Sequence, residues 1–188
     1  MKKIDDKYIL IAADMGGFPL KEAVKGYLIS KGWKVTDIGV QSADEVDSEM
    51  FQRIGFRVGA KITEGEFERA IIFCGTGMGI HIAASQCPHV QCAVVESVPA
   101  ATRCVTGNNC NVLAMGAYYI APQKGMAIAD AFLSARFGQG YEHIPNFNEF
   151  HKLAYDEIDA FDYEAFKANG FEPIRLGDYK IGDAARHP

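Results

Sequence analysis

Short apolar runs alternate along this chain with segments whose apolar residues recur at helical spacing. The first run, Tyr8 to Ala13, carries no charged residue, which is typical of a strand buried on both faces of a sheet. Four further segments favour strands: Trp33 to Val40, Ala70 to Phe73, Gln91 to Val95 and Asn111 to Met115.

Helical patterns occupy the intervals between these strands. Pro19 suits the first turn of a helix, and Gly32 ends it. A second helix is expected from Glu45 to Ile62, whose apolar residues recur about once per turn, at Val46, Met50, Ile54 and Val58. Further helical patterns follow at Ile80 to Ala84, Val98 to Thr106 and Gln123 to Ala135.

Strands that are separated by helices are joined by crossovers, which connect parallel strands. The pattern therefore predicts a five-stranded parallel sheet with helices on both faces, a three-layer α/β fold of Rossmann-like topology. We expect this domain to span residues 1–137.

Residues 138–188 are expected to form a C-terminal extension. An amphipathic helical pattern runs from Phe150 to Phe166. The extension is too rich in aromatic residues for a disordered tail: Phe147, Phe150, Tyr155, Phe161, Tyr163, Phe166 and Phe171. We expect it to pack on the chain's own sheet or on a neighbouring subunit.

Composition narrows the class of protein. The 188 residues carry a formal net charge of −5, which argues against nucleic acid or an anionic membrane as the main partner. No stretch of about 20 apolar residues is present to cross a membrane. The five cysteines include no Cys-x-x-Cys pair, so we expect reduced thiols in a cytoplasmic protein, without disulfides or a metal site.

The segment from Ala70 to Ala84 carries the clearest chemical signal. Its sequence, AIIFCGTGMGIHIAA, places Cys74 where a buried strand gives way to a glycine loop and a helix. Unpaired amides in such a loop can hold an anion, and they favour a thiolate over a thiol. Cys74 is therefore a candidate base or nucleophile, and His81 is a possible further site residue.

Each of these residues also has a purely structural interpretation. Free cysteine is often buried in a core, and a lone histidine on a helix is more often packed or solvated than catalytic. The position of Cys74 favours chemistry, because open α/β sheets bind ligands at the carboxyl ends of their strands.

A family resemblance joins these motifs. The first strand ends in Asp14 before a glycine turn, CGTGMGIHIAAS begins at Cys74, and NNCNVLAMG begins at Asn108. From Ile9 to Phe137 the chain resembles the family of ribose 5-phosphate isomerase B and galactose 6-phosphate isomerase. The resemblance implies a homodimer or homotetramer with sites shared between subunits, and aldose-ketose isomerisation of a sugar without metal or organic cofactor.

The resemblance also implies roles for individual residues. Cys74 would move a proton between adjacent carbons through an enediol, and Thr76 would position the thiol or the substrate. Asp14, Asn108 and Asn109 would bind substrate oxygens. The amides that would hold the enediolate oxygen are those of Gly75, Gly77, Met78 and Gly79.

Three positions depart from the family pattern. Met15, Gly107 and Tyr118 stand where the resemblance expects a histidine, a ring-opening histidine and a phosphate-binding arginine. Because an acyclic substrate needs no ring opener, a keto-uronate or a four-carbon sugar phosphate competes with a pentose phosphate. A replacement cation would come from Arg103, Arg136 or Lys124.

Other function classes stay open at this point. The run Gly75 to Gly79 followed by Glu96 resembles a dinucleotide fingerprint, but Ile80 stands where the third glycine belongs. A non-catalytic sugar or nucleotide binding module on the same fold is the second alternative. The presence of Cys74 at the start of the glycine loop favours an enzyme over a binding module.

Overall fold

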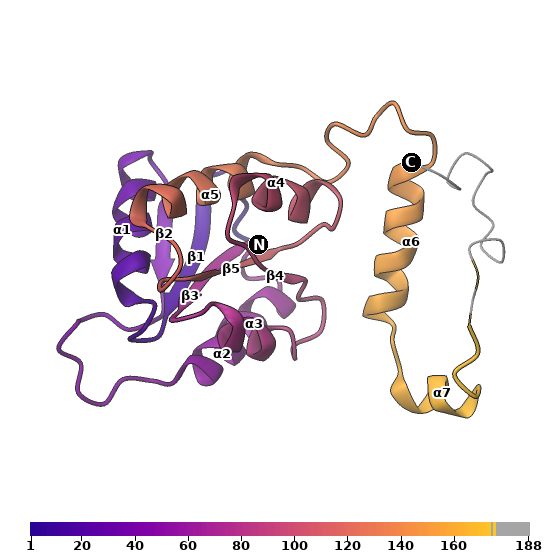
Figure 1. Cartoon of the computed structure of the whole chain (residues 1–188), viewed down its shortest axis with the longest axis horizontal. Coiled ribbons are helices and arrows are strands. Elements are labelled where there is room, and N and C mark those ends of the chain that lie inside the picture. The colour runs from indigo at the N-terminus through magenta and orange to yellow at the C-terminus, as the bar shows by residue number, and fades with distance from the viewer. Residues whose placement is uncertain (174, 176–188) are drawn as a thin grey trace. The chain divides into compact units, whose positions relative to one another are not determined.

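The computed structural model describes residues 1–173 and 175, and the chain divides into two units, Met1–Ala135 and Arg136–Pro188. The division falls two residues before the predicted boundary at 137. The first unit alternates strand and helix: β1 (Tyr8–Ala13), α1 (Phe18–Ser30), β2 (Lys34–Asp37), α2 (Phe51–Thr63), β3 (Ala70–Cys74), α3 (Met78–Ala84), β4 (Cys92–Val94), α4 (Val98–Thr106), β5 (Val112–Gly116) and α5 (Pro122–Ser134) (Figure 1).

The five strands form one parallel sheet in the order β2-β1-β3-β5-β4, which confirms the predicted fold class. In its register, Ala13 of β1 lies beside Phe73 of β3, and Cys74 lies beside Gly116 of β5. The segments that follow β1, β3 and β5 therefore emerge next to one another at the carboxyl edge of the sheet.

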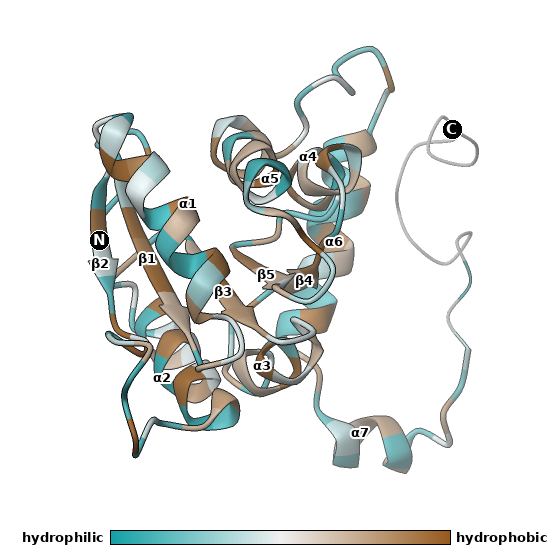
Figure 2. Ribbon diagram, turned by 60° about the vertical axis from the view of Figure 1, so that its left-hand side comes forward, coloured by the Kyte–Doolittle hydropathy of each residue, from teal (hydrophilic) through white to brown (hydrophobic). Residues whose placement is uncertain are grey.

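Helices cover both faces of the sheet (Figure 2). Successive residues of the central strands belong to the cores on opposite faces. Ile71 and Phe73 of β3 belong to a core shared with α1, α4 and α5, whereas Ile72 and Cys74 belong to a core shared with α2 and α3. The period of two along a strand thus directs the thiol toward the α2–α3 layer.

The predicted start of the second helix was wrong. Val46 and Met50 are exposed and precede α2, whereas Ile54 and Val58 are buried as expected. In the preceding segment the Glu45 carboxylate accepts a hydrogen bond from the Gln41 amide at 3.1 Å, so side-chain bonds to the backbone compete there with helix formation. The second strand is also shorter than predicted and ends at Asp37.

A buried ion cluster fixes α1 against the end of β2. The Lys21 side chain has no solvent exposure, and its ammonium group lies 2.7 Å from the Asp37 carboxylate. Burial opposes ionisation of Asp37, but hydrogen bonds from Lys21 and Lys25 outweigh it and hold the pKa of Asp37 below its ordinary value. Lys21 also donates to the Val40 carbonyl oxygen, which anchors the segment after β2.

Among its described residues, the second unit contains two helices where the sequence predicts one pattern, α6 (Phe147–Asp159) and α7 (Tyr163–Ala168). The break arises at Asp162, whose carboxylate caps α7 by accepting the Ala165 amide at 2.9 Å. Aromatic contacts occur within the unit, including stacking of Tyr141 on Phe147 at 4.0 Å between ring centroids.

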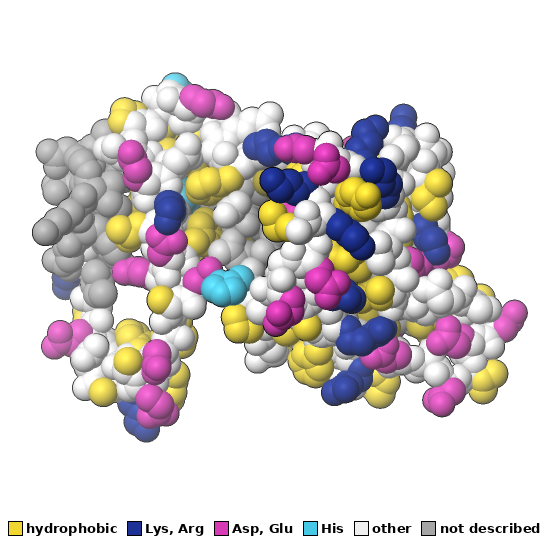
Figure 3. All heavy atoms as spheres, turned by 180° about the vertical axis from the view of Figure 1, so that it is seen from behind, with side chains coloured by type: hydrophobic (Ala, Val, Ile, Leu, Met, Phe, Trp, Pro, Cys, Tyr) yellow, Lys and Arg dark blue, Asp and Glu magenta, His cyan; other side chains and the backbone are white. Residues whose placement is uncertain are grey.

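Acidic and basic side chains are interspersed over the face of the first unit seen in Figure 3. Such mixing fits the small net charge and is unlike the continuous basic surface that binds nucleic acid. Within the part of the chain that the structure describes, every helix is too short or too polar to span a bilayer.

Candidate active site

Cys74 is the last residue of β3 and is 5% exposed. Its Sγ accepts a hydrogen bond from the Gly77 amide at 3.0 Å. The backbone of the glycine loop is thereby held directly against the sulfur at the end of β3.

The glycine loop closes tightly around this contact. Gly77 has a φ of +77°, which favours glycine, and a Cβ there would lie 2.9 Å from the backbone of β5. The Met78 amide donates to Thr76 Oγ1 at 3.3 Å. We expected unpaired amides in this loop, but the amides of Gly77 and Met78 form hydrogen bonds within it. The Thr76 hydroxyl therefore stabilises the loop, and the Gly77 amide is bonded to the Cys74 sulfur.

The turn after β1 packs directly against the glycine loop. The Asp14 carboxylate accepts the Gly17 amide at 2.8 Å, and a Cβ at Gly16 would lie 3.0 Å from the Gly75 nitrogen. Burial raises the pKa of Asp14, while amide hydrogen bonds from Gly17 and Gly16 oppose that rise. The structure therefore brings this predicted carboxylate to the same edge as Cys74.

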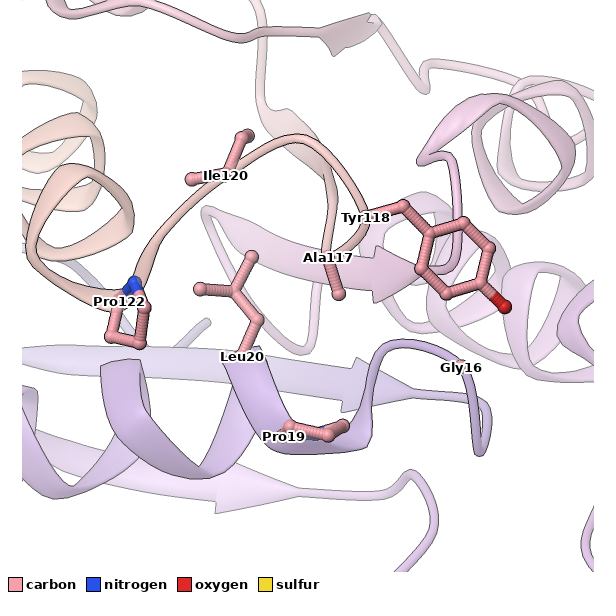
Figure 4. Close-up of a pocket in the computed structure, with 7 residues that line it drawn as sticks. All are labelled: Gly16, Pro19, Leu20, Ala117, Tyr118, Ile120 and Pro122. Carbon is pink, nitrogen blue, oxygen red and sulfur yellow. The ribbon is translucent and has the colours of Figure 1, made fainter.

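Tyr118 was not among the predicted site residues, yet its ring lies over the glycine loop (Figure 4). A Cβ on Gly75 would come within 2.5 Å of the Tyr118 ring, and the Tyr118 amide donates to the Gly75 carbonyl at 2.9 Å. The signal available in the sequence was that Tyr118 stands where the resemblance expects a phosphate-binding arginine, two residues beyond the last residue of β5.

A cavity of about 200 Å³ lies beside these loops, between the start of α1 and the segment that joins β5 to α5 (Figure 4). Tyr118 is the only one of its seven lining residues with a polar side chain. The cavity is lined by Gly16, Pro19, Leu20, Ala117, Tyr118, Ile120 and Pro122.

Asn108 and Asn109 lie at the opposite edge of the sheet. They precede β5, and the carbonyl of the neighbouring Asn111 accepts the Ala70 amide at the start of β3. Five strand residues separate that edge from Cys74 by about 13 Å, at about 3.3 Å per residue. Within one chain, therefore, the structure does not bring the asparagines together with the thiol.

Arg103 accompanies the asparagines at that edge. Its guanidinium occupies the space next to Gly107, where a Cβ would lie 2.8 Å from Cζ.

His81 faces the sheet, with a ring nitrogen 3.1 Å from the Cys92 carbonyl oxygen of β4. All five cysteines are free thiols, and burial raises the pKa of Cys92.

Comparison with known proteins gives a consistent result. A model of the family described as Ribose/Galactose Isomerase matches residues 9–150, beyond the Phe137 limit of the predicted resemblance. The chain is 38% identical over 159 residues to 4-deoxy-4-sulfo-D-erythrose isomerase of Clostridium sp. (strain MSTE9), covering 85% of this chain and 98% of that protein. It is 32% identical over 132 residues to D-erythrulose-4-phosphate isomerase of Pectobacterium atrosepticum, covering 70% and 86%.

Solved structures agree with these sequence matches. The ribose 5-phosphate isomerase B of Thermotoga maritima superposes with a TM-score of 0.72 at 31% identity, over 82% of this chain and 98% of that chain. The corresponding enzyme of Mycoplasma genitalium, with bound ribulose 5-phosphate, gives a TM-score of 0.70 at 29% identity, over 84% and 96%.

Proposed function

Since the chain belongs to the ribose/galactose isomerase family, we propose that this aldose-ketose isomerase acts on an open-chain four-carbon sugar with an anionic end, and that Cys74 is its base. The observation that carries the proposal is the Gly77 amide bonded to Cys74 Sγ at the carboxyl edge of the sheet. A non-catalytic module would have no use for a thiol held in this way.

The proposed reaction needs only proton transfers. The Cys74 thiolate takes the proton from the carbon beside the carbonyl, and the released electron pair forms the carbon–carbon double bond of an enediolate. The new thiol returns the proton to the former carbonyl carbon, while the hydroxyl proton passes between the two oxygens. Asp14 lies at the same edge and is proposed to bind those oxygens.

Two lines of argument support a four-carbon substrate. Three relatives among the matches are named for isomerisation of four-carbon sugars, one a sulfonate and two a phosphate. In addition, Gly107 stands where the resemblance implies a ring-opening histidine, and a four-carbon sugar substituted at its last carbon forms no stable ring and needs no such residue. Ribose 5-phosphate, which cyclises, fits this chain less well.

We also propose a homodimer or larger assembly in which each site is shared. Asn108 and Asn109 lie about 13 Å from the thiol edge of their own sheet, so their predicted contact with substrate requires the site of a second copy. The exposed aromatic side chains of the second unit, such as Phe161 and Phe166, are proposed to contribute to this assembly.

A substrate panel tests the proposed function. Purified protein is assayed with 4-deoxy-4-sulfo-D-erythrose, D-erythrulose 4-phosphate, ribose 5-phosphate and an open-chain keto-uronate. We expect the highest kcat/KM with a four-carbon substrate. A higher kcat/KM with ribose 5-phosphate or the keto-uronate would overturn the substrate assignment, and no turnover of any of them would overturn the function.

A further inference from the structure

We propose that Cys104 and Cys110 are oxidised by peroxide to a reversible disulfide, and that this bond lowers activity by displacing the loop that carries Asn108. The inference rests on the proposed function, because this loop is proposed to bind substrate in the site of a second copy. The disulfide itself forms whether or not the chain is an isomerase, so the two proposals fail separately.

The end of α4 brings the two cysteines together. Asn109 has a φ of +47°, the left-handed conformation that commonly ends a helix, and its amide donates to the Val105 carbonyl oxygen at 3.0 Å. One residue later, the Cys110 amide donates to the Cys104 carbonyl oxygen at 2.9 Å. A helix end of this kind places the residue after the left-handed one against the last helical turn. Cys110 and Cys104 occupy these two positions.

The side chains of the two cysteines are also in contact. The Cys110 thiol donates a hydrogen bond to the Cys104 sulfur, and the Cys104 thiol donates to the Ala101 carbonyl oxygen at 3.2 Å. Both cysteines are buried in one core, with exposed fractions of 7% and 8%. Cys92 of β4 packs against the core on the other face of the sheet. Cys104 and Cys110 therefore form a pair that excludes Cys92.

The surroundings make Cys104 the sulfur that reacts first. The hydrogen bond from Cys110 and the nearby guanidinium of Arg69 lower the pKa of Cys104, although burial opposes them. Arg69 is fixed in place because it donates to the carbonyl oxygens of Phe132 and Ala135 at the end of α5. The hydrogen bond to Cys104 raises the pKa of Cys110, which therefore keeps its proton and reacts second.

The oxidation is a two-electron reaction with hydrogen peroxide. The Cys104 thiolate attacks one peroxide oxygen, so a sulfur–oxygen bond forms, the oxygen–oxygen bond breaks, and the departing hydroxide takes up the proton that Cys104 had released. The Cys110 sulfur then attacks the Cys104 sulfur. A sulfur–sulfur bond forms, the sulfur–oxygen bond breaks, and the departing hydroxide leaves as water with the Cys110 proton. Two thiols are thus oxidised while one peroxide is reduced to two waters.

The disulfide would act on the loop between the two cysteines. Residues 105–109 lie between them and include both asparagines of the proposed shared site. A covalent bond holds the two sulfurs closer together than a hydrogen bond does, so the loop must move relative to α4. A displacement of about 1 Å at a substrate contact lowers the rate about 100-fold, and we therefore expect oxidation to lower kcat/KM at least about tenfold.

The proposed shared site also gives the oxidant its access. With Asn108 against substrate in the site of a second copy, the loop lies beside an opening that admits a four-carbon sugar. Hydrogen peroxide is smaller and enters the same opening. Bound substrate covers the loop, so it should slow formation of the disulfide.

The test compares reduced protein with protein treated with hydrogen peroxide. Peptide mass spectrometry of the treated wild type should show a linkage between Cys104 and Cys110 that dithiothreitol removes. The kcat/KM for the preferred four-carbon substrate should fall at least about tenfold and recover with dithiothreitol. In the Cys74→Ser variant, which lacks the catalytic thiol, excess substrate should slow the appearance of the linkage.

Variants separate the pair from the catalytic thiol, which peroxide also attacks. Cys104→Ala and Cys110→Ala cannot form the linkage but keep Cys74, so each should keep most of its activity under the same treatment. Cys92→Ala is the matched control, because it removes a neighbouring buried thiol and leaves the pair intact. It should lose activity as the wild type does.

The outcomes distinguish this proposal from the proposed function. No linkage between Cys104 and Cys110 in treated wild type, or a linkage that forms equally fast with substrate present, would overturn the proposal. An equal loss of activity in Cys104→Ala and the wild type would also overturn it and assign the loss to Cys74. If reduced wild type isomerises no substrate of the panel, the proposed function fails, while the linkage is still measured.

Discussion

Replacing Gly17 by alanine should damage both stability and activity, because this glycine lies directly against the strand that carries the thiol. A Cβ there would lie 2.4 Å from the Phe73 carbonyl carbon and 2.7 Å from the Cys74 nitrogen. Both neighbours are backbone atoms of β3, so no flexible side chain can move away. Either α1 or the end of β3 must shift.

The magnitude follows from the contacts. Overpacking of a core typically costs about 1–3 kcal/mol, and a clash between backbone segments belongs at the upper end, so we expect about 2–4 kcal/mol. Displacement of Cys74 by about 1 Å should also lower kcat/KM about 100-fold. Gly26 provides a control in the same helix, since a Cβ there would meet nothing within 4 Å.

The assay is urea unfolding of the two alanine variants beside the wild type. Gly26→Ala should raise the free energy of unfolding by about 0.5–1 kcal/mol, because alanine loses less backbone entropy than glycine in a helix interior. Gly17→Ala should lower it and reduce turnover. If both variants unfold at the same urea concentration as the wild type, the packing of α1 on β3 described above is wrong.

Three further outcomes follow from the structure. Asp37→Asn should lower the free energy of unfolding at pH 7 by about 3 kcal/mol, because Lys21 would keep a buried charge without this partner. Since the pKa of Asp37 is lowered in the folded state, the Asp37 carboxylate stabilises the fold fully above about pH 4, and this stabilisation is lost as the pH falls through the folded-state pKa. The difference in the free energy of unfolding between the wild type and Asp37→Asn should therefore shrink in urea titrations at acid pH. A 1:1 mixture of Cys74→Ser and Asn108→Ala chains, each inactive alone, should recover about a quarter of wild-type activity after random subunit exchange, and no recovery would contradict shared sites. Isomerisation should survive dialysis against EDTA, because the proposed proton transfers use protein groups, and a loss reversed by one divalent metal would contradict that mechanism.

Local sequence signals located the strands and the thiol well. The bounds of β1 and α4 match the predicted ranges, because a charge-free run ends at Asp14 and because Ser97 caps α4 by accepting the Ala100 amide at 3.3 Å. The start of α2 was missed, since hydrogen bonds such as that between Gln41 and Glu45 hold the preceding segment outside the helix.

The arrangement of the site could not be deduced from the same signals. Tyr118 lies over Gly75 because β3 and β5 are neighbours, and that strand order is a property of the whole chain. Because β3 and β5 run parallel, Asn108, which precedes β5, lies at the edge of the sheet away from Cys74. The motif that begins at Asn108 does not by itself reveal this position. Residue types therefore indicated the chemistry, and topology decided which residues share one edge.

The most direct test of the central claim is kcat for Cys74→Ser on the preferred four-carbon substrate, measured together with its Kd. Serine preserves the shape of the side chain but does not ionise near neutral pH, so we predict a kcat at least about 1,000-fold below wild type. The Kd should stay within about threefold, because the proposed binding contacts do not involve sulfur. A variant that retains more than about a tenth of wild-type kcat would contradict Cys74 as the base.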